Sequence, residues 1–85
     1  MDFSNYITQA KILLSIGQTT NAELVLAHLL QMRTTQTSFR SKEIKTVIFS
    51  RVPKMSEMVF RKSLHELRKN GILKKEFGIY TLNLK

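Results

Sequence analysis

The chain has 85 residues, of which 42% are hydrophobic and 24% charged, and it contains no cysteine. This length and composition predict one globular domain and exclude disulfide bonds, thiolate metal sites and cysteine nucleophiles. The longest apolar run, Leu24 to Leu30, is far shorter than the roughly 20 residues that a membrane-spanning helix needs. Asp2 stands where a signal peptide carries positive charge, so we expect a cytoplasmic protein.

The net charge of +8 arises entirely in the second half of the chain. Residues 1–39 hold two basic and two acidic residues, whereas residues 40–85 hold twelve Lys and Arg against four Glu. A neutral half joined to a strongly basic half predicts a scaffold attached to a surface for a polyanion. Taken alone, the same charge also fits a basic face that is merely solvated.

The first predicted element is a helix over residues 4–16, in an N-terminal segment of residues 1–18. Its apolar residues recur at helical spacing, and Gly17 supplies a left-handed stop. Ile12 and Ile16 lie one turn apart, away from the main apolar stripe. A domain of this size rarely covers two faces of a terminal helix. We therefore predict that these two isoleucines join two copies of the chain in a homodimer.

A second helix is predicted over residues 20–33. It starts with a capping box, in which Thr20 accepts a backbone hydrogen bond and Glu23 reaches back to the chain. Apolar residues surround nearly its whole circumference, which is typical of a central, buried helix. His28 lies among them, and we interpret it as a core histidine bonded to the backbone rather than a metal ligand. Residues 34–38 then form a polar loop.

Two further helices are expected in a helix-turn-helix over residues 41–70. Ser41 should cap the first of them, and Pro53 ends it because the ring fixes φ and disfavours helix at the preceding residue. Ser56 should cap the second, which is the longer one. Gly71 follows it as the left-handed residue that closes its C-terminus.

Residues 72–85 are predicted to form a β-hairpin. Two strands, residues 72–75 and 79–84, flank the segment 76–78, which suits a type I turn closed by a left-handed glycine. Together these elements predict a mainly α domain with a small C-terminal β-hairpin, an α+β fold that spans residues 1–85.

The segment from Arg40 to Lys74 resembles the winged helix-turn-helix superfamily of DNA-binding proteins. The residues that carry the resemblance are Leu64-x-x-Leu67-x-x-x-Gly71-Ile72-Leu73. In that family this motif is the end of the recognition helix, its glycine cap and the first strand of the wing. The resemblance covers about half of the chain. It implies a winged helix with an extra N-terminal helix, and double-stranded DNA as the partner.

On a helical wheel, the last helix has an apolar face with Phe60, Leu64 and Leu67 and an opposite face that is mostly cationic. A helix fits the major groove, where arginine and lysine can donate to guanine. The candidate base-contacting residues are Ser56, Met58, Arg61, Lys62, His65 and Lys69. Phosphate contacts are expected from Arg40, Lys42, Lys45 and Lys54, and from Lys74 and Lys75 of the wing.

The wing departs from the family's usual pattern. Members that insert the wing into the minor groove carry Arg or Lys at its tip, whereas the tip here is Glu76-Phe77-Gly78 and is very short. We therefore expect the hairpin to be mainly structural, sealing the core with Tyr80 and Leu82.

No catalytic, metal or cofactor site is predicted. The glycines are isolated, so there is no loop to cradle a phosphate, and neither histidine has a second ligand at metal-binding spacing. No serine–histidine–carboxylate set is suggested either. We expect no enzyme, no small-molecule ligand and no membrane contact.

Three hypotheses for function remain open. The first is a homodimer that binds specific DNA sequences and regulates transcription, in the nucleoid or inside a host cell. The second is a non-specific or architectural DNA binder, for example in partition or genome packaging. The third is a winged helix that binds another protein within a transcription or replication complex.

Overall fold

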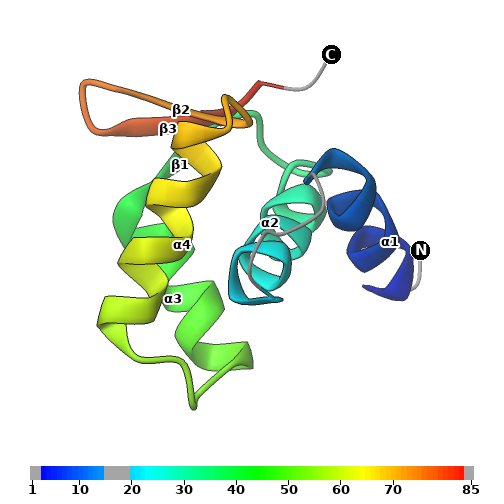
Figure 1. Ribbon diagram of the computed structural model, residues 1–85. Coiled ribbons are helices and arrows are strands. Elements are labelled where there is room, and N and C mark those ends of the chain that lie inside the picture. Colours follow the sequence, from blue (N-terminus) through cyan, green and yellow to red (C-terminus); the bar gives the residue numbers. More distant parts are fainter. Residues whose placement is uncertain (1–2, 15–19, 84–85) are drawn as a thin grey trace.

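The computed structural model describes residues 3–14 and 20–83 (Figure 1). This part of the chain forms a mainly helical α+β domain with a small antiparallel sheet, as predicted. The elements in chain order are α1 (Phe3–Leu13), α2 (Thr20–Met32), β1 (Phe39–Arg40), α3 (Ser41–Arg51), α4 (Glu57–Lys69), β2 (Leu73–Glu76) and β3 (Ile79–Leu82). No helix of the described ranges is long and apolar enough to cross a membrane.

Helix α2 lies at the centre of the helical part, between α1 on one side and α3 and α4 on the other (Figure 1). Every residue from Val25 to Leu30 is buried, since apolar side chains cover most of the helix surface. The prediction of a central, buried helix is confirmed. The core continues through Ile44 and Ile48 of α3 and Leu67 of α4, all fully buried.

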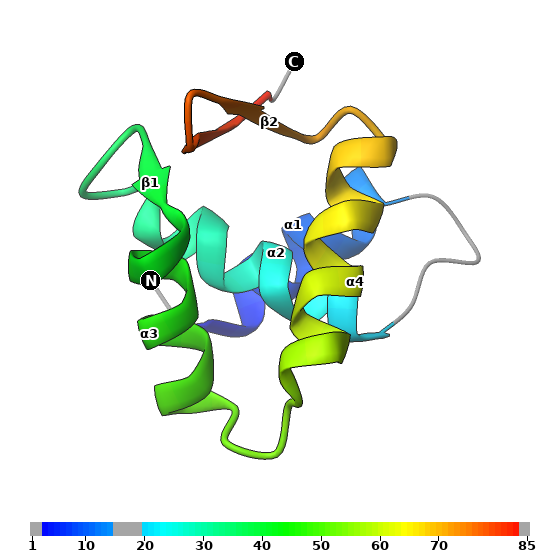
Figure 2. The same ribbon diagram turned by 90° about the vertical axis from the view of Figure 1, so that its left-hand side faces the viewer.

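The sheet caps the ends of α3 and α4 (Figure 2). Its strand order is β1-β3-β2, and all neighbours are antiparallel. Strand β1 was not predicted, because two residues are too short to show an alternating pattern. It forms where Phe39 pairs with Tyr80 of β3, and both side chains are buried. The expected sealing role of Tyr80 is thereby confirmed, whereas Leu82 is only partly buried.

Two predicted helix boundaries were wrong. Helix α1 ends at Leu13 rather than residue 16, and Ile16 and Gly17 lie outside the described residues. Ser41 does not cap α3; it is the first helical residue, and Arg40 occupies the capping position. The backbone N–H of Arg40 donates to the Glu43 carboxylate at 2.9 Å, so the acid of the first turn stabilises this start.

The boundaries of α4 match the prediction. At its start, the backbone N–H of Val59 donates to Ser56 Oγ at 3.2 Å, as expected of a capping serine. At its end, Gly71 has φ of 75°, and the N–H of Ile72 donates to Leu67 O at 3.0 Å. This left-handed glycine turn directs the chain back along the helix end and into β2.

The hairpin turn differs from the predicted type I turn. Glu76 pairs with Ile79, so only Phe77 and Gly78 form the loop, and their φ angles are +51° and +77°. Two residues with positive φ are the signature of a type I′ turn, whose twist matches that of the flanking strands. A bulky residue rarely takes the first of these positions. Phe77 is therefore held in an unfavourable backbone conformation.

Replacing Phe77 with asparagine is expected to stabilise the domain by about 1 kcal/mol, because asparagine tolerates positive φ far better than phenylalanine. The Phe77 ring is fully exposed, so no packing is lost. Urea denaturation measures the change. Phe77→Ala is the matched control, since it removes the ring but keeps the strained backbone. Equal stability of the alanine and asparagine variants would contradict a strained turn.

His28 is buried in α2, as the interpretation of a core histidine requires. Its Nδ1 lies 2.9 Å from Leu24 O, and its ring centre lies 4.6 Å from that of Phe3 in α1. Burial lowers the pKa of His28 below its ordinary value of 6.5, although the bond to Leu24 opposes the shift. The ring is therefore held neutral, with Nδ1 donating to the carbonyl.

This buried histidine predicts a loss of stability in mild acid. Its pKa is lower in the folded state, so the unfolded chain takes up the proton first as the pH falls below about 6.5. The stability that neutral His28 contributes is fully present above that pH. It is lost as the pH falls towards the pKa that His28 has in the folded state. Urea denaturation between pH 7.5 and 5.5 measures the slope. His28→Gln should flatten this slope, and an unchanged slope in that variant would contradict the role assigned to His28.

Candidate nucleic-acid interface

Helix α4 has two distinct faces. Phe60, Leu64 and Leu67 are buried against the rest of the domain, together with Ser63, whose hydroxyl donates to Val59 O at 2.8 Å. The outward face of α4 consists of Met58, Arg61, Lys62, His65 and Lys69, all of them exposed. The structure therefore places these candidate residues on one exposed surface, as the helical wheel predicts.

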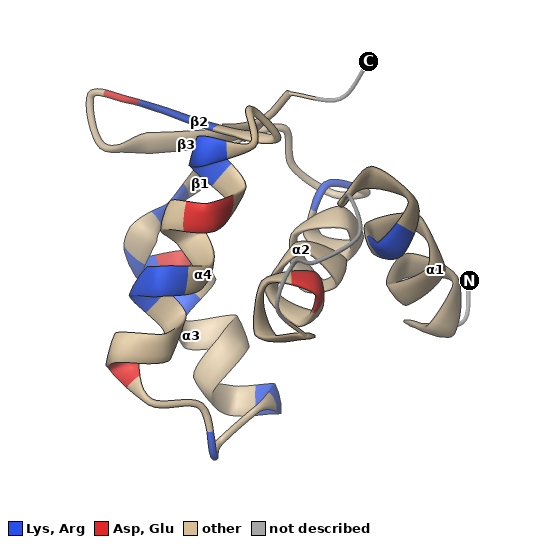
Figure 3. Ribbon diagram, in the orientation of Figure 1, with Lys and Arg blue, Asp and Glu red and all other residues tan. Residues whose placement is uncertain are grey.

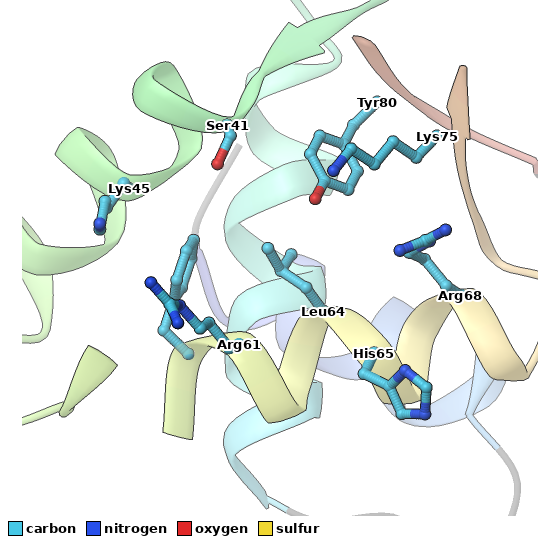
Figure 4. A pocket seen from close by; sticks show the side chains of 9 residues that line it. Ser41, Lys45, Arg61, Leu64, His65, Arg68, Lys75 and Tyr80 are labelled. Atoms are coloured by element: carbon cyan, nitrogen blue, oxygen red, sulfur yellow. The ribbon is translucent and has the colours of Figure 1, made fainter. Parts of the chain in front are cut away.

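A groove of about 400 Å³ runs between the start of α3, helix α4 and the sheet (Figure 4). Basic residues from three elements line it, and no acidic residue does. The lining residues are Ser41, Lys45, Phe60, Arg61, Leu64, His65, Arg68, Lys75 and Tyr80. We call this the α3–α4 groove. Its concave shape brings together charges that are far apart in the sequence.

A second hollow, of about 520 Å³, lies on the other side of Arg68, between α4 and β2. It is lined by His65, Arg68, Lys69, Leu73, Lys74, Lys75 and Glu76. We call it the α4–β2 hollow. His65, Arg68 and Lys75 line both depressions, so they stand on the ridge between them. Positions of Lys and Arg thus extend along the ribbon from α3 across α4 to the hairpin, with a few acidic positions among them (Figure 3).

One carboxylate neutralises part of the surface at the start of α4. Glu57 Oε1 lies 2.5 Å from Lys45 Nζ of α3 and 3.2 Å from an amino nitrogen of Arg61. The hydrogen bond from Lys45 is the main cause that holds the pKa of Glu57 below its ordinary value, and the charges of Lys45 and Arg61 add to it. All three side chains are solvent-exposed, so these pairs contribute little to stability.

Two cations at the other end of the groove have no acidic partner. Within the described part of the chain, neither Arg68 nor Lys75 forms an ion pair. Lys75 Nζ instead lies 5.4 Å from the centre of the Tyr80 ring, a distance suited to a cation–π contact. Their charges therefore remain available to an external anion.

The remaining predicted phosphate contacts are spread more widely. Arg40 and Lys42 are exposed at the start of α3 but do not line the α3–α4 groove. Lys54 lies in the turn before α4, at the opposite end of that helix from the hairpin. Lys74 lines only the α4–β2 hollow. The hydroxyl of Ser56 accepts the capping hydrogen bond described above.

Arg68 and Tyr80 were not among the predicted site residues. Arg68 lies seven residues after Arg61, two helical turns along the same edge of α4, so helical spacing alone could have revealed it. Tyr80 enters the site through the pairing of β3, which the sequence of α4 does not reveal. Among the described residues, no three His, Asp or Glu side chains are grouped closely enough to hold a metal ion.

The predicted dimer contact lies away from this surface. Ile12 is 77% exposed on α1, which is on the opposite side of the molecule from α4 (Figure 1). Ile16 falls outside the described residues. The surface around Ile12 is thus accessible to a partner without obstructing the grooves.

The order of the elements and the sheet order β1-β3-β2 are compatible with a winged helix. In that arrangement α3 and α4 would be the helix-turn-helix, and β2 and β3 the wing. No protein family model matches the chain, and neither a curated protein nor a solved structure gives a significant match to it.

Proposed function

We propose that the chain is a winged helix-turn-helix protein that binds double-stranded DNA, with α4 lying in the major groove. The observation that carries this proposal is the continuous cationic surface over the outward face of α4, the α3–α4 groove and the α4–β2 hollow. Glu76 is the single acidic residue that lines either depression. Phosphodiester backbones are the natural ligand for such a surface.

We assign the outward face of α4 to contacts with the base edges of the DNA. An α-helix with its side chains is about as wide as the major groove, roughly 12 Å. Lys62, His65 and Lys69 can donate to base edges there, and Met58 can contact a thymine methyl group. Arg61, although paired with Glu57, stands at the edge between base and backbone.

The depressions on either side of α4 are assigned to phosphates. Lys45 approaches from α3, Arg68 from α4 and Lys75 from β2, so that a backbone strand entering the α3–α4 groove meets charge from three elements. Ser41 adds a hydroxyl donor at the start of α3. Arg40, Lys42, Lys54 and Lys74 remain proposed outer contacts with the phosphates on either side of α4.

We further propose that the protein acts as a homodimer that regulates transcription. A single α4 reads few base pairs, and pairing two copies doubles the recognised site. The exposed Ile12 on α1, remote from the DNA surface, is the proposed centre of the dimer contact. Sedimentation equilibrium at tens of micromolar should show a dimer, and a monomer at that concentration would remove this part of the proposal.

One observation favours the second candidate, a non-specific or architectural binder. Lysine is a flexible point charge, whereas sequence readout relies mainly on bidentate Arg, Asn or Gln. On the outward face of α4 only Arg61 has such a side chain, and its guanidinium is engaged by Glu57. A surface of this kind can hold DNA firmly while discriminating weakly between sequences.

In vitro selection from random duplexes decides between these candidates. A regulator should enrich a palindrome, whose symmetry would also report the dimer. An architectural binder should retain DNA without enriching any sequence, and competition between random and selected duplexes should then give a ratio near one. A protein-interaction module should retain no DNA at low salt, which would overturn the proposal.

A further inference from the structure

Glu57, the first residue of α4, contacts two cations of the α3–α4 groove without lining the groove itself. Its Oε1 receives both contacts, at 2.5 Å from Lys45 Nζ and 3.2 Å from an amino nitrogen of Arg61. Lys45 comes from α3, whereas Arg61 lies one helical turn further along α4. Figure 4 shows Lys45 and Arg61 at one end of the groove and Arg68 at the other. One carboxylate oxygen thus joins the two cations at the same end.

Stability of the helix does not account for these contacts. An acid in the first turn interacts favourably with the helix dipole whether or not it also meets a cation, and Ser56 already caps α4. The side chains of Lys45, Glu57 and Arg61 are 41%, 50% and 75% exposed. Ion pairs as exposed as these contribute little to folding. What the contacts change is the charge that the groove offers to a ligand.

The two ends of the groove therefore differ in the charge that is available. At the hairpin end, Arg68 and Lys75 form no ion pair within the described part of the chain. At the other end, Lys45 and Arg61 share one carboxylate. The pKa of Glu57 is held below its ordinary value, mainly by the hydrogen bond from Lys45, so the carboxylate is ionised at neutral pH. Glu57 thus cancels one of the two positive charges at its end.

We propose that Glu57 is an internal counter-ion that a DNA phosphate must displace from Lys45 and Arg61, and that it keeps the affinity below what the cations alone would give. Phosphate and carboxylate oxygens compete for the same N–H donors. Because all three side chains are exposed, this exchange needs no change in the core. The duplex is then held most firmly at the hairpin end of the groove. This inference rests on the proposed function and adds a residue that weakens binding.

The test is the affinity of the full chain for one mixed-sequence duplex, measured by fluorescence anisotropy with wild type, Glu57→Gln and Glu76→Gln. Release of two exposed ion pairs in Glu57→Gln should strengthen binding about 2- to 30-fold. Glu76→Gln is the matched control, since it also raises the net charge from +8 to +9 and changes a residue of the α4–β2 hollow. Within the described residues Glu76 forms no ion pair, so its gain should be clearly smaller. Thermal unfolding verifies that both variants fold.

The same substitution in a Lys45→Gln background provides the second readout. Glu57 then holds only Arg61, so the gain from Glu57→Gln should shrink by at least about 2-fold, as expected of residues in direct contact. A gain no larger than that of Glu76→Gln, or an equal gain with and without Lys45, would overturn the counter-ion while leaving the proposed function standing. Absence of duplex binding by wild type would instead overturn the proposed function, and the counter-ion with it.

Discussion

Reversing the charge of Arg61 and Lys62 together is expected to abolish binding to duplex DNA. Each substitution to glutamate removes two charge units, so the net charge falls from +8 to +4. The new acids would lie at the centre of the cationic surface, where they repel phosphates rather than merely failing to bind them. Hydrogen bonds to charged groups contribute about 1.5–3 kcal/mol each, so the affinity should fall by roughly 100-fold or more.

The matched control is the double reversal of Lys11 and Arg33. It lowers the net charge to the same +4 but changes exposed residues in the first half of the chain, away from both depressions. Anisotropy with one duplex at low salt compares the two variants, and circular dichroism verifies that both fold. If the control weakened binding as much as the double variant at α4, net charge rather than this surface would be responsible.

Truncating Leu29 to alanine is expected to have the largest effect on stability. Its side chain is fully buried in α2, the helix that contacts α1, α3 and α4. Removing a buried leucine side chain costs about 2–5 kcal/mol, through the lost transfer free energy and the cavity left behind. A domain of 85 residues has a total stability of about 4–13 kcal/mol. The truncation should therefore remove a large part of the total stability, and the urea midpoint should fall accordingly.

Leu13→Ala is the control for this truncation. Leu13 has the same side chain, but it is 36% exposed at the end of α1, so its loss should cost clearly less. Urea denaturation of both variants gives the comparison. Equal losses would show that α2 is not the centre of the core.

The elements that were predicted well from the sequence are those whose ends or burial are marked by a few neighbouring residues. Ser56 caps α4 by bonding to a backbone N–H three residues ahead, and Gly71 ends the same helix by adopting positive φ. Such features depend on a few neighbouring residues, so they can be recognised in the sequence. The burial of α2 follows in the same way from apolar residues on all its sides.

The fold predictions were wrong where pairing between strands distant in the sequence decides the structure. Strand β1 consists of two residues and exists because Phe39 pairs with Tyr80, which is distant in sequence. The hairpin register, with Glu76 opposite Ile79, shortens the loop and imposes positive φ on Phe77. Single-sequence patterns contain no information about which residues stand opposite each other in such short strands.

The candidate site was also predictable only in part. Helical spacing reveals the residues that share a face of α4, whereas contacts between distant elements form only in the folded chain. Helical spacing placed Arg61, Lys62 and Lys69 on one exposed face, and the structure agrees. The α3–α4 groove needs Lys45, Arg68 and Lys75 to converge from three elements, and that convergence is a property of the folded chain. Helical spacing alone could therefore give the outward face of α4 but not the concave surface beside it.

The central claim is that the cationic surface binds the phosphate backbone of duplex DNA, and the salt dependence of the affinity tests it most directly. Each neutralised phosphate contributes about −0.9 to the slope of log K against log salt, and four or more of the cations around α4 should engage. We therefore expect binding at about 50 mM salt and a slope of about −3.6 or steeper. No binding at that salt concentration, or an affinity independent of salt, would contradict the claim.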